Sequence, residues 1–281
     1  MRAIKLLTLN SHSLVEENYN DKFDEFVNAI SCEQPDIIAL QEVNQTCCKA
    51  VVSESELEGF SLCDKKTVIR EDNHVYNVVK KLRERGINYY WTWVGIKVGY
   101  GKYDEGMALM SLSPIIETDV LLVSKINDYQ NWKTRKIIGI RTVENPNEWF
   151  YTVHYGWWND EEEPFQNQWQ NTDIYMKKHN SVWLMGDFNS PAEIRDEGYD
   201  MIAAGNWNDS YNMAEKKDSG ITVGKVIDGW KEKIESTDGM RIDQIWCSQE
   251  PVVKSSEVIF DGKNYEVVSD HYGIIVEYER N

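Results

Sequence analysis

Four short apolar runs, each with the character of a β-strand, adjoin side chains that bind metals or transfer protons. The runs at residues 4–9, 37–40 and 182–185 lead into Asn10, Gln41-Glu42 and Gly186-Asp187-Phe188-Asn189, and Ser269-Asp270-His271 precedes the run at 273–276. Hard cations bind carboxylate and amide oxygens, and attack at phosphorus needs a poised imidazole. A single Asp or Asn at a strand end is commonly a turn former, so it is the combination that is typical of a metal-dependent phosphoesterase.

The spacing of the other apolar residues predicts packed β-sheets with helices outside. Helical spacing occurs over residues 19–32, 75–82 and 165–178. Strand-like runs occur at residues 36–40, 107–112, 119–123, 136–143, 149–154, 241–247, 257–260 and 273–278. Because strands outnumber helices and many are consecutive, the pattern favours sheets that pack on each other. Residues 46–72, with many charges and little periodicity, are predicted to form a loop.

Length and composition predict one soluble domain over residues 1–281. No Pro-, Gly- or Ser-rich linker divides the chain, and 41% of its residues are hydrophobic, enough for a sizeable core. No apolar run approaches the roughly 20 residues of a membrane span. The N-terminus opens directly on a strand pattern without a signal sequence, and the five cysteines follow no disulfide framework, so we expect a cytoplasmic protein with reduced thiols.

The charge balance argues against a nucleic-acid substrate. The chain has 30 Lys and Arg residues against 47 Asp and Glu residues, a net charge of −17. Such a surface repels a polyanion unless a local basic patch overrides it. The basic stretches at residues 80–85 and 177–178 lie in predicted helices and are interpreted as solvated helix faces.

The order of these motifs resembles that of the endonuclease/exonuclease/phosphatase superfamily from residue 4 to residue 278. The motifs, in chain order, are Asn10, Glu42, Glu105-Gly106, Thr152-Val153-His154, Gly186-Asp187-Phe188-Asn189, Arg241-Ile242-Asp243 and Ser269-Asp270-His271. The resemblance implies a four-layer α/β sandwich, two mainly antiparallel sheets flanked by helices, with the site at one sheet edge. It also implies in-line attack of water on a phosphate ester.

The metal site is predicted around Glu42. Mg²⁺ takes one or two carboxylates and keeps several waters, which suits a lone Glu at a strand end. Asn10 would complete or orient this shell, and the resemblance places Asp270 beside the metal. Mg²⁺ is the expected ion and Mn²⁺ the alternative, with one or two metals left open.

Proton transfer is assigned to His271. An imidazole has an ordinary pKa of about 6.5 and can act as a general base near neutrality. The resemblance places Asp243 as the carboxylate that orients this imidazole, and it places Asp187 and Asn189 at the attacking water and the scissile phosphate.

A second imidazole and an arginine are expected on the phosphate. The resemblance gives His154 this contact, with Glu105 as its carboxylate partner, and a cationic His154 would stabilise negative charge on the transferred group. Arg135 matches a family arginine near this side of the site, although an arginine at a strand start can equally be a surface charge.

Aromatic residues near these motifs predict a sugar-binding rim. Trp157 and Trp158 follow His154 on a loop that also carries four acidic residues, and Tyr103 precedes Glu105. Aromatic rings stack on sugars or on bases, but an acidic loop would repel a nucleic-acid backbone. About half of the Trp residues are expected to lie in the core instead. The two aromatic segments resemble the bacterial maltose 6'-phosphate phosphatase-like members of the superfamily.

Three functions therefore stay open. A phosphomonoesterase for a sugar phosphate, with maltose 6'-phosphate as the example, fits the acidic composition and the aromatic segments. An endonuclease or other phosphodiesterase would need a basic groove. A non-enzymatic scaffold would have lost motif residues, and none is lost here. The motifs alone do not separate a mono- from a diester, and the oligomeric state is left open.

Overall fold

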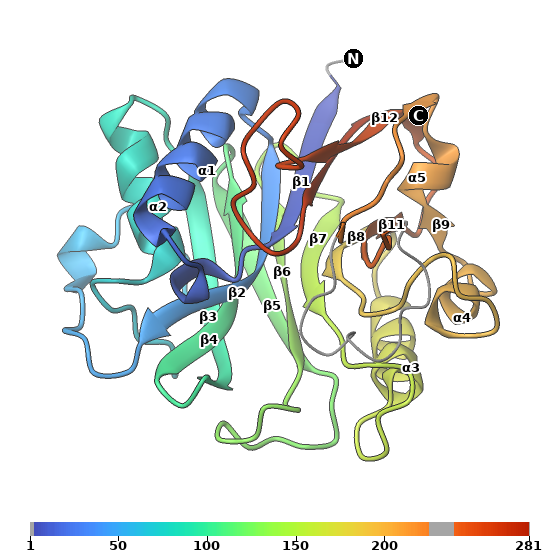
Figure 1. Cartoon of the computed structure of the whole chain (residues 1–281), viewed down its shortest axis with the longest axis horizontal. Coiled ribbons are helices and arrows are strands. Elements are labelled where there is room, and N and C mark those ends of the chain that lie inside the picture. The colour runs from blue at the N-terminus through green and yellow to red at the C-terminus, as the bar shows by residue number, and fades with distance from the viewer. Residues whose placement is uncertain (1–2, 225–238, 281) are drawn as a thin grey trace.

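The computed structural model describes residues 3–224 and 239–280, and it consists of two β-sheets packed face to face with helices on their outer faces (Figure 1). Within these residues, one sheet has seven strands in the order β10-β12-β13-β1-β2-β4-β3 and the other has six in the order β5-β6-β7-β8-β11-β9. Both sheets are mixed, because most strand pairs are antiparallel whereas β1 with β2, β7 with β8 and β10 with β12 are parallel. This is the predicted four-layer α/β sandwich.

The strands are β1 (Ile4–Asn10), β2 (Ile37–Thr46), β3 (Tyr90–Gly99), β4 (Tyr103–Ser111), β5 (Ile115–Leu122), β6 (Lys136–Thr142), β7 (Trp149–His154), β8 (Val182–Asp187), β9 (Asn208–Asp209), β10 (Lys216–Lys217), β11 (Asp243–Cys247), β12 (Val252–Ile259) and β13 (Gly273–Glu279). The helices are α1 (Tyr19–Glu33), α2 (His74–Glu84), α3 (Phe165–Met176), α4 (Gly198–Ala203) and α5 (Ser210–Met213), with 3₁₀ turns η1 (Ser13–Val15) and η2 (Glu54–Glu56). None of the helices in the described ranges is long and apolar enough to cross a membrane.

The inner strands are apolar on both faces because each face packs on a different layer. On β4, Met107 and Leu109 point into the core between the sheets, whereas Ala108 and Met110 point to the core under α1 and α2. A third core lies between the six-stranded sheet and α3. Successive side chains of a strand alternate between its faces, so the continuous apolar runs of the sequence correspond to strands buried on both sides.

The predicted helices and strands are present, and the structure adds strand β3, for which the sequence analysis made no prediction. Trp91 and Trp93 lie on β3 and are only 1% exposed, so they are among the Trp residues in the core. The predicted loop at residues 46–72 contains the short turn η2 and isolated bridges rather than a regular element.

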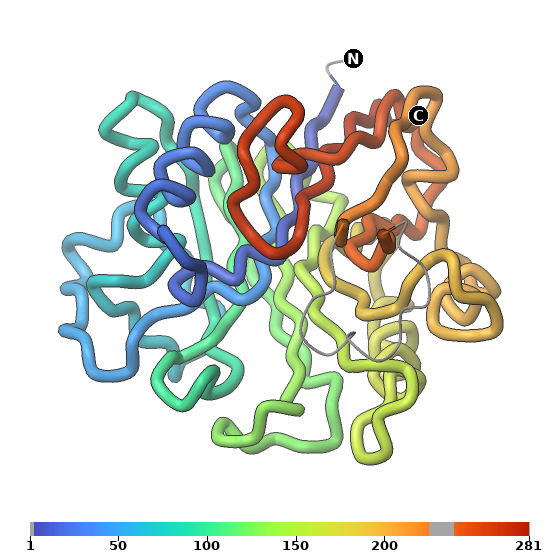
Figure 2. Tube along the Cα trace, viewed as in Figure 1, coloured from blue at the N-terminus to red at the C-terminus, as the bar shows by residue number. Residues whose placement is uncertain are grey.

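Strand register brings the motif residues to one edge of the sandwich. Asn10 pairs with Gln41 across β1 and β2, while Asp187 pairs with His154 on one side and with Asp243 on the other. Figure 2 shows how the first strand and the last strand of the chain lie side by side, as the pairing of β1 with β13 requires. Residues far apart in the sequence therefore meet at the carboxyl ends of β1, β7 and β8.

Candidate active site

A buried histidine and aspartate form the centre of the site. The imidazole of His271 donates from Nδ1 to Oδ2 of Asp243 over 2.9 Å, and the two side chains are 5% and 0% exposed. Burial alone would lower the pKa of His271, but the charge and the hydrogen bond of Asp243 raise it well above its ordinary value. The predicted pairing of the two side chains is present, but Asp243 stabilises the protonated imidazole, a form that donates a proton, whereas the predicted general base needs the neutral form.

Asp187 lies against this pair. A ligand oxygen of Asp187 is within 4.8 Å of ligand atoms of both Asp243 and His271. Asn10 donates to its Oδ2 over 3.2 Å, and the backbone N–H of Asn189 donates to its Oδ1 over 2.8 Å. Burial and the neighbouring Asp243 raise the pKa of Asp187 to about 7. Asp187 can therefore accept a proton near neutral pH.

Glu42 faces the same space from within β2, which does not end at Leu40 as predicted but bulges between Leu40 and Val43 and continues to Thr46. Nδ2 of Asn10 donates to its Oε1 over 3.0 Å, so one amide bridges Glu42 and Asp187. Burial and the charges of Glu105 and Asp270 raise the pKa of Glu42. Carboxylates that repel one another in a buried space are the donor set that a hard divalent cation neutralises. Glu42 offers carboxylate oxygens of this kind, and Asn10 holds its side chain in place.

His154 is near the expected place, but in a different charge state. Its Nε2 lies 3.5 Å from Oδ2 of Asp187 and 4.0 Å from Oε1 of Glu42. Burial and the cations Arg135 and Lys97 hold the pKa of His154 well below its ordinary value. The predicted imidazolium is therefore corrected to a neutral imidazole, which can still donate one hydrogen bond to a phosphate oxygen.

Glu105 pairs with a lysine that the sequence analysis missed. Oε1 of Glu105 lies 3.0 Å from Nζ of Lys97, and each side chain is only 9% exposed. The predicted partner, His154, forms its own close contacts with Asp187 and Glu42. Gly99 leaves room for this carboxylate, because a Cβ there would lie 2.5 Å from its Oε2. A lysine between apolar residues of β3 was the available signal.

Arg135 is an inward-facing residue and not a surface charge. It is 8% exposed and precedes β6, and its Nη1 donates to the carbonyl oxygen of Trp132 over 2.9 Å. Its Nε has no hydrogen-bond partner among the described residues. The negative charges of Glu105, Glu42 and Asp187 act on its guanidinium, which places it beside the catalytic carboxylates.

The aromatic rim consists of Trp157 and a second tryptophan, Trp132. Nε1 of Trp157 donates to Oδ1 of Asn189 over 3.1 Å, and the ring of Trp132 lies 5.7 Å from that of Trp157. Trp132 is 48% exposed. The other two predicted members face elsewhere, because Trp158 packs on the core beneath α3 and Tyr103 is 6% exposed with its hydroxyl bonded to Leu14. Their placement does not fit a substrate-binding role.

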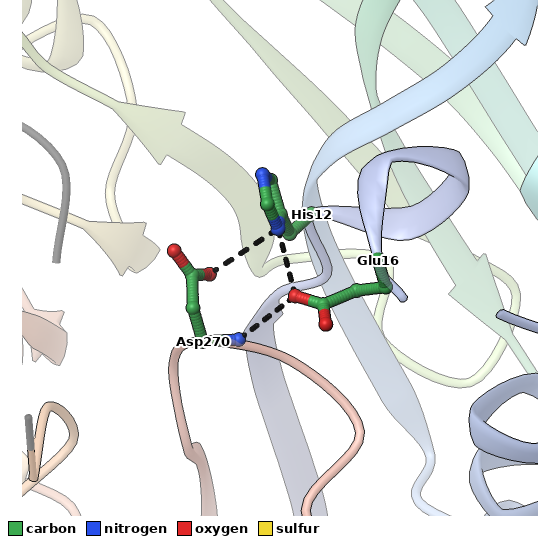
Figure 3. A group of neighbouring side chains, drawn as sticks. All are labelled: His12, Glu16 and Asp270. Carbon is green, nitrogen blue, oxygen red and sulfur yellow. Dashed lines mark hydrogen bonds and ion pairs between the residues drawn. The ribbon is translucent and has the colours of Figure 1, made fainter. Parts of the chain in front are cut away.

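His12 is the third residue that the sequence analysis missed at this edge. Figure 3 shows His12, Glu16 and Asp270 turned toward one another. Oε1 of Glu16 accepts hydrogen bonds from Nδ1 of His12 over 2.7 Å and from the backbone N–H of Asp270 over 3.0 Å. Burial lowers the pKa of His12, but Glu16, Asp270 and Glu42 together raise it to about 9. The cluster ties the Asp270 loop to the first turn of the chain.

A cavity of about 800 Å³ lies away from this chemistry and is lined among others by Glu148, Trp207 and Arg280. Trp149 and Val182 begin the strands that end at His154 and Asp187, so this cavity opens at the opposite end of the sandwich. We assign the site from the arrangement of ionisable groups rather than from cavity size.

The glycine of the Gly186-Asp187-Phe188-Asn189 turn is required by close backbone contact. Its φ is +149°, and a Cβ would lie 2.1 Å from the carbonyl oxygen of Val153 on β7.

Gly186→Ala is expected to lower the free energy of unfolding by at least about 2 kcal/mol, because a backbone atom cannot move aside cheaply. Urea unfolding measures this loss. Gly101→Ala, at φ +67° with nothing within 4 Å, isolates the cost of the dihedral, and equal losses in both variants would contradict the steric explanation.

Comparison with known proteins agrees with this arrangement. The model of the Endonuclease/Exonuclease/phosphatase family matches residues 7–271. A solved family protein from Leptotrichia buccalis C-1013-b shares 34% identity and superposes with a TM-score of 0.86, covering 99% of this chain and 100% of its own. No curated protein matches.

More distant solved structures share the fold. A mannosyl-6-phosphatase from Bacteroides thetaiotaomicron VPI-5482 is 17% identical with a TM-score of 0.66, covering 98% of this chain and 99% of its own. A humanized D. rerio TDP2 is 14% identical with a TM-score of 0.60, covering 99% of both chains. Since the family model spans nearly the whole chain and a solved family protein is 34% identical over 99% of it, this protein belongs to the endonuclease/exonuclease/phosphatase family of metal-dependent hydrolases.

Proposed function

We propose that this chain is a divalent-metal-dependent phosphomonoesterase that acts on a phosphorylated sugar. The observation that carries the proposal is the pair of tryptophans at the catalytic edge. Trp157 contacts Asn189 directly, and the exposed Trp132 extends the aromatic surface outward. Flat aromatic surfaces beside a polar site suit the apolar face of a sugar ring. The mannosyl-6-phosphatase neighbour is an enzyme of the same substrate class, and maltose 6'-phosphate is a candidate substrate.

The charge around the rim separates this substrate from a polynucleotide. Asp160 lies on the loop after Trp157, and its carboxylate is paired with Lys133 over 2.9 Å. Lys133 also lies 2.9 Å from Glu162, so this half-buried cation beside the rim is already neutralised. A nucleic-acid backbone needs several unneutralised cations along its path. A compact sugar phosphate needs them only at the phosphate itself.

The buried groups assign the chemistry. Attack of water forms a new P–O bond while the P–O bond to the sugar breaks. The proton lost by the water passes to Asp187, beside the protonated imidazole of His271 that Asp243 holds, and the departing sugar oxygen takes up a proton from solvent. The neutral His154 donates to a phosphate oxygen. Mg²⁺, or Mn²⁺, held by Glu42 and Asp270, would offset negative charge on the phosphate.

Trp132→Ala tests the sugar platform without touching the catalytic groups. We expect KM for a disaccharide 6'-phosphate to rise about fivefold to tenfold while KM for p-nitrophenyl phosphate changes less than about twofold, because only the larger substrate reaches the platform. Trp157→Phe keeps a ring but removes the N–H that contacts Asn189, so it separates stacking from positioning. Steady-state phosphate release measures both substrates.

The matched control is Tyr90→Ala. Tyr90 is an exposed aromatic residue at the start of β3, the end of that strand away from Lys97. This substitution is expected to leave both KM values unchanged. A plasmid-nicking assay accompanies these measurements because bases also stack on tryptophan. Efficient nicking by the wild-type enzyme without turnover of any sugar phosphate would reject the proposed function in favour of a nuclease.

A further inference from the structure

Two buried basic residues lie near the site. Lys97 is 7% exposed and Arg135 is 8% exposed, and burial together with the charge of Arg135 lowers the pKa of Lys97. Both cations also act on His154, whose imidazole contacts Asp187. Burying two like charges together is costly unless negative charge compensates them. Their position therefore calls for an anion.

Carboxylates act on both residues, but of the two only Lys97 has a carboxylate of the described residues in ion-pair contact. Glu105 forms a close ion pair with Lys97, whereas the hydrogen bonds of the Arg135 guanidinium go to the carbonyl oxygens of Trp132 and Thr134. Nε of Arg135 is buried and has no partner among the residues that the structure describes. A buried, unpartnered N–H on a cation is the group that a bound oxyanion would satisfy.

Resting on the proposed function, we propose that Lys97 and Arg135 form a subsite for two charged oxygens of a phosphate monoester and thereby select a dianion over a singly charged diester. The proposed substrate, a phosphate monoester, carries two negative charges near pH 8, whereas a phosphate diester carries one. Arg135 offers a planar set of donors and Lys97 a point charge, which together match two oxygens on one phosphorus. Lys97 is the residue that adds the second charge.

The test removes that charge and compares two esters that differ by one charge. In the full-length Lys97→Met protein with Mg²⁺, the ratio of kcat/KM for p-nitrophenyl phosphate to that for bis(p-nitrophenyl) phosphate is expected to fall at least about tenfold, as for a lost hydrogen bond to a charged group. Lys97→Arg keeps the charge and should hold the ratio within about threefold. An equal loss on both esters would overturn the proposal, because a merely structural lysine affects both alike.

Two further variants control for charge and folding. Lys102→Met removes an exposed lysine from the turn that follows β3, and it should leave the ratio unchanged. Lys97→Met leaves Glu105 buried without its partner, so the double variant Lys97→Met/Glu105→Gln removes both charges and preserves neutrality. If the single variant unfolds, the same tenfold fall in the double variant supports the subsite, and an unchanged ratio overturns it.

Binding of inorganic phosphate separates this proposal from the proposed function. In calorimetric titration without metal at pH 8, the wild-type protein is expected to bind phosphate at least about tenfold more tightly than Lys97→Met. If the wild-type enzyme hydrolyses no sugar phosphate, the sugar-phosphatase function is rejected. A tenfold difference in phosphate affinity between the wild type and Lys97→Met would still support the anion subsite. Equal affinities in the two proteins would reject the subsite even if sugar phosphates are hydrolysed.

Discussion

Asp187→Asn and His271→Gln are each expected to lower kcat by about a thousandfold or more, with sugar phosphate or aryl phosphate as substrate. Both groups belong to one proton-handling unit, held together by the hydrogen bond of His271 to Asp243 and by the closeness of all three side chains. Residues that act as a unit have strongly non-additive effects. The double variant should therefore be within about tenfold of either single variant.

Single-turnover phosphate release measures these losses, and circular dichroism checks the fold. Removal of the imidazole leaves Asp243 buried without its partner, so the stability of the His271 variant must be measured beside its activity. His179→Gln is the matched control, since this histidine bonds to Tyr151 outside the site. Fully multiplicative losses in the double variant would show that Asp187 and His271 act independently.

Glu42→Gln is expected to lower turnover at limiting Mg²⁺ by at least about a hundredfold. Mutation of a residue that only hydrogen-bonds a metal ligand already lowers metal affinity or activity by about 10–100-fold, and loss of a carboxylate ligand should lower activity at least as much. The amide keeps the shape of the side chain and its contact with Asn10 but loses the charge that a hard cation binds. Activity titrated against Mg²⁺ should show a raised apparent dissociation constant that high metal partly restores.

Metal binding can also be followed without turnover. Mn²⁺ paramagnetic resonance counts the bound ion directly, and the Glu42 variant is expected to bind it more weakly than the wild type. Glu54→Gln, which neutralises a carboxylate on η2 that is not buried, provides the control for net charge. Wild-type affinity in the Glu42 variant would remove this residue from the metal site.

The sequence was sufficient for most of the long elements, although strand β3 was not predicted. Continuous apolar runs predicted strands buried on both faces, and helical spacing predicted α1, α2 and α3 close to their observed bounds. Asn10 and Asp187 could be placed at strand ends because a strand end is local information, whereas Glu42 lies at a bulge inside β2 that the sequence did not reveal. Their convergence follows once β1 pairs with β2 and β7 pairs with β8.

The environment of each group was decided by tertiary structure alone. Lys97 and Arg135 lie about 40 residues apart in the sequence, yet both lower the pKa of His154, so no local pattern could show that this imidazole is neutral. Trp132 reaches the rim from a loop that carries no motif, whereas Tyr103, inside a motif-rich segment, points into the protein. Sequence patterns record which residues follow one another along a strand. Burial, charge and the facing of side chains depend on which strands and loops meet, and that is settled only when the sheets pack.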